Sequence, residues 1–217
     1  MKSTIPPVYE YSVTEERWNI LTHGFGFVMS VVGLIFLSFR ESVTLKARIS
    51  LIIFGVSLCL LYLASTLYHK AVKPRRRAIL NIVDHAAIYI LIAGTYTPFT
   101  LVTLEGKIGW TIFYIAWGIA LLGVILKLFF TGKYNLLSTL LYVGMGWLIV
   151  SVYAPLLNQL HPKGVWWLFA GGLAYTLGAI LYSIKKIPYN HAIFHVFVLL
   201  GSFCHFCSIY FYVGLPG

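Results

Sequence analysis

Charged residues are scarce in this sequence of 217 residues. Asp, Glu, Lys and Arg make up 10% of it, whereas hydrophobic residues make up 59%, and the mean hydropathy is +0.85. A soluble domain carries about 25% charged residues. The composition therefore excludes a water-soluble fold, and it excludes an intrinsically disordered chain for the same reason.

Acidic residues are fewer still, with six Asp and Glu against 16 Lys and Arg, which gives a net charge of +10. In a soluble protein such an excess would indicate nucleic-acid binding. Here the basic residues lie in short gaps between long apolar runs. We therefore expect them to lie at a membrane surface, and we expect no nucleic-acid partner.

Cysteine is also rare, and Cys59, Cys204 and Cys207 all lie inside apolar runs. An odd number of cysteines without regular spacing argues against a disulfide framework. We interpret Cys204 and Cys207 as small packing residues.

Long uncharged runs occupy most of the chain, and only Asp84 interrupts one of them. Each run has the roughly 18 residues that a helix needs to cross about 30 Å of hydrocarbon, and a backbone in lipid must satisfy its own hydrogen bonds. We predict an all-α, seven-transmembrane helix bundle, multi-pass in the cell membrane, with residues 18–217 as one domain. The runs are Trp18–Phe39, Ile49–His69, Ala78–Leu104, Ile108–Leu126, Tyr134–Leu160, Gly164–Ile184 and Ile187–Gly217.

Residues 1–17 form an N-terminal segment without an apolar core, so we expect no signal peptide there. Ser12-Val13-Thr14-Glu15 fits a capping box, which predicts a short interfacial helix leading into the first span.

Lys and Arg are divided unequally between the two sides of the predicted bundle. With a cytoplasmic N-terminus, the cytoplasmic segments hold 11 of the 16 and the external segments hold five. The positive-inside rule therefore predicts a cytoplasmic N-terminus and an extracytoplasmic C-terminus. The 11 cytoplasmic residues are Lys2, Arg17, Lys70, Lys73, Arg75, Arg76, Arg77, Lys127, Lys133, Lys185 and Lys186.

Polar residues of four predicted spans fall at one depth in this topology. Ionisable groups are costly in a membrane, so their gathering in the cytoplasmic third indicates a functional site. The residues concerned are His23, Ser65, His69, Asp84, His85, His191 and His195.

The spacing of these residues favours a metal site. His191 and His195 are four residues apart and share one helix face at about 6 Å, and His69 from a neighbouring helix can add a third nitrogen. Three protein ligands with an open fourth position are typical of catalytic zinc, although imidazole also suits copper, iron or nickel. Asp84 or Ser65 can orient a ligand or hold the water at the metal.

Simpler interpretations exist for the same histidines. A single histidine near a span end, such as His23, His85 or His161, is more often an interfacial polar residue, and a lone pair at i, i+4 is often structural. His205 lies ten residues beyond His195, about 15 Å deeper. We expect it to line the cavity or bond a neighbouring helix.

Four motifs in order carry a family resemblance. They are Glu16-x-x-Asn19-x-x-Thr22-His23, Ser65-x-x-x-His69, Asp84 and His191-x-x-x-His195. The set resembles the haemolysin III family of bacterial membrane proteins over about residues 12–213. That family is related to the progestin and adipoQ receptors, which include the adiponectin receptors, in a wider superfamily that contains alkaline ceramidases.

The resemblance implies zinc held by His69, His191 and His195, with Asp84 and Ser65 acting around the water at the metal. In the relatives the implied chemistry is hydrolysis of a lipid amide such as ceramide, whereas the name haemolysin implies pore formation. The resemblance gives no firm role to the remaining motif residues, Glu16, Asn19, Thr22 and His23, or to His205.

Our leading hypothesis is a zinc-dependent intramembrane hydrolase of a lipid amide or ester, with a membrane lipid as substrate. Asp84 would act as general base and then as general acid. The alternative is a non-enzymatic signalling or homeostasis protein, or a pore, in which a structural zinc has Asp84 or His85 as fourth ligand. Transport is a third option, but no pair of broken helices in matching halves supports it.

Overall fold

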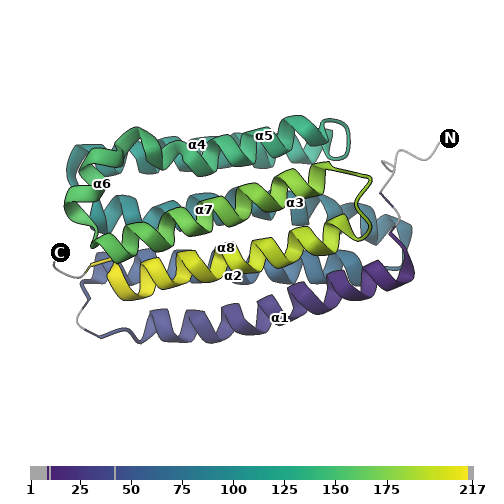
Figure 1. Ribbon diagram of the computed structural model, residues 1–217, viewed down its shortest axis with the longest axis horizontal. Helices are drawn as coiled ribbons and strands as arrows, with labels where there is room; N and C mark the ends of the chain where they lie inside the picture. The colour runs from purple at the N-terminus through teal and green to yellow at the C-terminus, as the bar shows by residue number, and fades with distance from the viewer. Residues whose placement is uncertain (1–8, 10, 42, 215–217) are drawn as a thin grey trace.

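A computed structural model describes residues 9, 11–41 and 43–214, and these residues form a bundle of helices (Figure 1). Within this part of the chain, seven helices are long and apolar enough to cross a membrane, which confirms the predicted bundle. Lys2, most of the predicted N-terminal segment up to residue 10, and the end of the last apolar run at Gly217 lie outside the described residues.

Short connections join the spans, and α1 packs against α2, α2 against α3, α3 against α4 and α7 against α8 (Figure 1). The last helix, α8, packs against both α7 and α1, so the first and last helices of the chain are neighbours. The elements are α1 (Val13–Ser38), α2 (Leu45–Lys70), α3 (Pro74–Pro98), the π-helix η1 (Phe99–Thr103), α4 (Gly106–Phe130), α5 (Asn135–Gly146), the 3₁₀-helix η2 (Trp147–Val152), α6 (Tyr153–Gln159), α7 (Pro162–Ser183) and α8 (Asn190–Tyr212).

Three helices, α2, α3 and α8, form the interior of the bundle. Half or more of the residues in their apolar windows are buried, against less than a third in the other four spans. These inner helices carry Ser65, His69, Asp84, His191 and His195, the residues predicted as metal ligands or as acting around the metal.

Helix α1 begins where the capping sequence predicts. The Ser12 hydroxyl accepts the Glu15 N–H at 3.2 Å, and this satisfies one of the free donors of the first turn. The helix predicted to lead into the first span is continuous with it, because α1 runs without a break from Val13 to Ser38. Its first turn is an extension of the spanning helix.

The third and fifth spans depart from regular α-helix. Pro98 has no N–H to donate, and the chain changes there from α-helix to the π-helix η1. The predicted span Tyr134–Leu160 is confirmed as one of the seven, but a 3₁₀ segment interrupts its α-helix after Gly146. Tyr96 holds this break, since its hydroxyl contacts the Gly146 carbonyl at 2.8 Å and accepts the Ile149 N–H at 2.8 Å.

Candidate metal centre

Three buried imidazoles meet at one end of the bundle. His69 lies in the last turn of α2, while His191 and His195 lie one turn apart at the start of α8. One ring nitrogen of each lies within 4.8 Å of the other two, and the Nε2 atoms of His69 and His191 are 3.1 Å apart. Tetrahedral ligands at about 2.0–2.1 Å from an ion are about 3.3 Å from one another. This group could therefore hold a metal ion.

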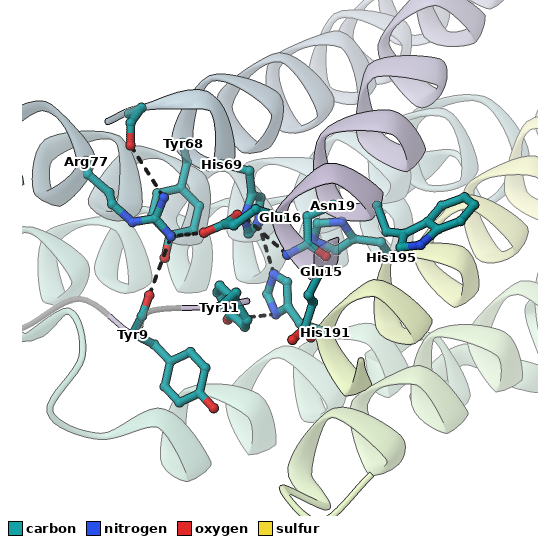
Figure 2. Close-up of polar contacts among 12 residues, drawn as sticks. Tyr9, Tyr11, Glu15, Glu16, Asn19, Tyr68, His69, Arg77, His191 and His195 are labelled. Atoms are coloured by element: carbon teal, nitrogen blue, oxygen red, sulfur yellow. Dashed lines mark hydrogen bonds and ion pairs between the residues drawn. The ribbon is translucent and has the colours of Figure 1, made fainter. Parts of the chain in front are cut away.

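The outer ring nitrogen of each histidine already has a polar neighbour (Figure 2). His69 Nδ1 lies 2.7 Å from Glu16 Oε2, His191 Nδ1 lies 3.1 Å from the Tyr11 hydroxyl, and His195 Nδ1 lies 3.3 Å from Thr22 Oγ1. A hydrogen bond at Nδ1 fixes the ring and leaves the Nε2 lone pair for a metal. The donor set therefore fits a metal ion bound through Nε2.

The protonation of these partners agrees with that role. The Thr22 hydroxyl donates to the Trp18 carbonyl at 2.8 Å, so its oxygen is free to accept the His195 Nδ1–H. Burial raises the pKa of Tyr11, which keeps the phenol neutral, and its oxygen can likewise accept from His191 Nδ1. Glu16 supplies a carboxylate to His69.

Glu16 also joins three helices. Its other carboxylate oxygen pairs with Arg77 of α3, whose guanidinium lies 4.9 Å from the centroid of the Tyr68 ring (Figure 2). Asn19 is fully buried one turn along α1, with its amide nitrogen 3.4 Å from His69 Nδ1. The i, i+3 spacing of Glu16, Asn19 and Thr22 places them on one helix face, and the structure turns this face toward the three histidines.

Asp84 and Ser65 are both buried, and they line the same cavity as His191 and His195. The Ser65 hydroxyl is buried and has no hydrogen-bond partner among the described residues. Among the described residues, the converging group contains only the three histidines, and neither Asp84 nor His85 belongs to it. The His85 Nδ1 instead lies 2.8 Å from the Asn81 carbonyl.

The cavity beside the histidines extends between α3, α5, α7 and α8, and most of its wall is apolar. It continues past Tyr96 and Trp147 to Leu168 and His205. His205 Nε2 donates to the Leu168 carbonyl at 3.1 Å, which confirms that this residue bonds a neighbouring helix. The cavity is therefore mainly apolar and has polar groups on its wall near the imidazoles of His191 and His195.

His23 and His85 both line the cavity. His23 is buried and stacks on His195 with ring centroids 3.4 Å apart and planes 13° apart. Neither of its ring nitrogens has a hydrogen-bond partner within the described part of the chain. His161 does lie at a helix end, where its Nδ1 accepts the Lys163 N–H at 3.2 Å.

Comparison with known proteins agrees with this arrangement. The family model described as "Haemolysin-III related" matches residues 11–206. Hemolysin-3 of Bacillus cereus is 46% identical over 93% of both chains, and the Hemolysin-3 homolog of Bacillus subtilis (strain 168) is 46% identical over 95% of this chain and 98% of its own. The human monocyte to macrophage differentiation factor is 29% identical over 94% of this chain and 87% of its own. No solved structure gives a significant match. The chain therefore belongs to the haemolysin III family of membrane proteins.

Proposed function

We propose that this protein is a zinc-dependent hydrolase that cleaves an amide or ester bond of a membrane lipid. One observation carries the proposal. Three imidazoles with occupied outer nitrogens lie at the end of an apolar cavity whose wall also holds the carboxyl of Asp84 and the hydroxyl of Ser65. This combination supplies metal ligands, a base and a hydrocarbon-binding space at one place.

Zinc suits the donors, because three neutral imidazoles with an open position are typical of its catalytic sites. Bound there by His69, His191 and His195, zinc would supply a Lewis acid and a lowered pKa for water. Glu16, Tyr11 and Thr22 would hold the three rings in the required orientation.

Asp84 is the proposed general base. Its carboxylate would take the proton from the attacking water and later give a proton to the leaving amine or alcohol. Ser65, which is buried in the wall of the same cavity, would hydrogen-bond this carboxyl and keep it turned toward the cavity. The acyl chain of the lipid would enter between helices and lie along the apolar wall, which excludes bulk water from the reaction.

Metal analysis combined with a lipid hydrolysis assay tests the proposal. We expect about one equivalent of zinc per purified chain, lost on substitution His191→Ala. Asp84→Asn should keep the metal and lower hydrolysis of a ceramide or a phospholipid ester at least about 100-fold, the lower end of what general base catalysis contributes. Glu105→Gln is the matched control, because Glu105 is exposed and pairs with Lys46 away from the site.

Two results would overturn the proposal. The first is less than about half an equivalent of zinc in the unaltered protein, since a site of this kind should be loaded. The second is no hydrolysis by any zinc-loaded preparation, in which case the metal would be structural. Full hydrolysis by Asp84→Asn would refute the base role of Asp84 alone.

A further inference from the structure

Lys127 is a buried cation that the proposed reaction does not use. The sequence places it after the fourth apolar run, but the structure places it in the last turns of α4 with only 3% of its surface exposed. Its side chain lines the same cavity as Asp84 and His85. A buried ammonium group is costly unless an opposite charge or several hydrogen bonds compensate it.

The partners of Lys127 compensate it only in part. Its Nζ donates to Ser138 Oγ at 2.6 Å and lies 5.7 Å from the centroid of the Tyr142 ring. The Ser138 hydroxyl donates in turn to the Tyr134 carbonyl at 3.0 Å, so it is an acceptor toward the ammonium. No carboxylate forms an ion pair with Lys127 among the described residues. An ammonium has three donors, and Ser138 uses one.

The position of Lys127 in the cavity indicates which kind of group could be the counter-ion of its ammonium. Tyr142, whose ring centroid lies 5.7 Å from Lys127 Nζ, donates its hydroxyl to the carbonyl of His85 at 2.9 Å, and His85 adjoins Asp84 in α3. The ammonium is therefore at the polar end of the cavity, on the wall formed by α4 and α5, and His191 and His195 of α8 line the same cavity. From this end the apolar wall continues toward Trp147 and Leu168.

We propose that Lys127 binds the anionic group, a carboxylate or a phosphate, of a long-chain lipid whose hydrocarbon lies in this cavity. The hydrocarbon is matched to the apolar wall, and the negative charge supplies the missing counter-ion of the ammonium. Binding of this kind requires neither metal nor cleavage. The further step, that Lys127 selects anionic lipids as substrates for hydrolysis, rests on the proposed function.

Binding of chain-matched probes to the purified protein in detergent tests the proposal. The probes are palmitate, 1-palmitoyl lysophosphatidic acid and the neutral hexadecanol. We expect Lys127→Met to weaken binding of at least one anionic probe about tenfold or more, because it loses a charge-assisted hydrogen bond. Hexadecanol binding should stay unchanged, and Lys127→Arg should restore the anionic probe. Lys46→Met is the control, since Lys46 pairs with the exposed Glu105.

The outcomes separate the possible sources of the charge. Loss for palmitate alone identifies a carboxylate, and loss for lysophosphatidic acid alone identifies a phosphate headgroup. The inference would be overturned if Lys127→Met weakened the binding of hexadecanol as much as that of the anionic probes. It would also be overturned if Lys127→Met bound the anionic probes as tightly as the unaltered protein does. Lys127→Gln, which can still bond Ser138, replaces the Met variant if that one does not fold.

This experiment is independent of the hydrolysis assay. A protein that binds palmitate through Lys127 but cleaves no lipid would refute the proposed function and leave the inference intact. A protein that needs Asp84 for hydrolysis but binds anionic probes equally well without Lys127 would do the reverse.

Discussion

At the scale of single residues, the outer shell of the metal centre distinguishes the three histidines from one another. His69 has a carboxylate at Nδ1, His191 a phenol and His195 a hydroxyl. A carboxylate makes the imidazole more basic and a better ligand than a neutral acceptor does. We therefore expect Glu16 to be the most important of the three partners.

Substitution Glu16→Gln should weaken metal binding about 10–100-fold without abolishing it, the effect typical of losing such a partner. Competition with a chromophoric chelator at equal protein concentration measures this affinity. Thr22→Val should have a smaller effect, because its contact to His195 is longer and uncharged. Glu105→Gln should have none, since it lies away from the site. Unaltered affinity in Glu16→Gln would show that the Glu16 contact does not support the ligand.

The ligand histidines could be proposed from sequence because helical spacing is informative about one face. His191 and His195 are four residues apart, so they share a face of any helix. The roles of Glu16, Tyr11 and Thr22 could not be derived in this way. Their spacing predicts a common face for Glu16 and Thr22, but only the packing of α1 against α2 and α8 determines what that face meets.

At the scale of helices, glycine sets how closely α7 and α8 approach. A Cβ at Gly171 would overlap the His205 ring and lie 3.0 Å from the Gly201 carbonyl oxygen. Close backbone approach at small residues is a general feature of helix pairs in membranes. A Cβ added at Gly118 on α4 would have no atom within 4 Å. Gly118 therefore provides a comparison in another helix of the same bundle.

We expect Gly171→Ala to destabilise the protein by about 1–3 kcal/mol, because the added methyl group forces the two helices apart. Gly118→Ala should be neutral or stabilising by up to about 1 kcal/mol, since alanine favours helix more than glycine. Thermal unfolding in one detergent compares the two variants. A Tm for Gly171→Ala equal to that of Gly118→Ala would contradict the close contact.

Charge and hydropathy predicted the number of helices better than their ends. Helix α2 begins at Leu45, four residues before the apolar run at Ile49, because Thr44 caps it and its charged first turn can extend beyond the hydrocarbon. The irregular turn after Gly146 left no signal in hydropathy. The turn depends on hydrogen bonds with Tyr96, a residue of another helix. These contacts cannot be inferred from the apolar run itself.

At the scale of the whole molecule, the basic segments gather at the end that holds the metal centre. Lys70 ends α2 directly after His69, Lys73 lies in the connection to α3, and Arg75 lies in the first turn of α3. The start of α8 lies at the same end, close to Lys185 (Figure 1). We propose that this end faces the cytoplasm, because the positive-inside rule places such clusters there.

Labelling of single cysteines by a membrane-impermeant maleimide tests this orientation. In a variant with Cys59, Cys204 and Cys207 replaced by alanine, we expect Lys163→Cys to react in intact cells and Lys73→Cys to react only after lysis. Both positions are exposed. Lys163 lies in the first turn of α7 and Lys73 lies just before α3, at opposite ends of the bundle. The reverse pattern would place the imidazoles beneath the outer surface. The three histidines would then take a metal ion from outside the cell. The orientation therefore decides whether the site is loaded from the cytoplasm or from outside.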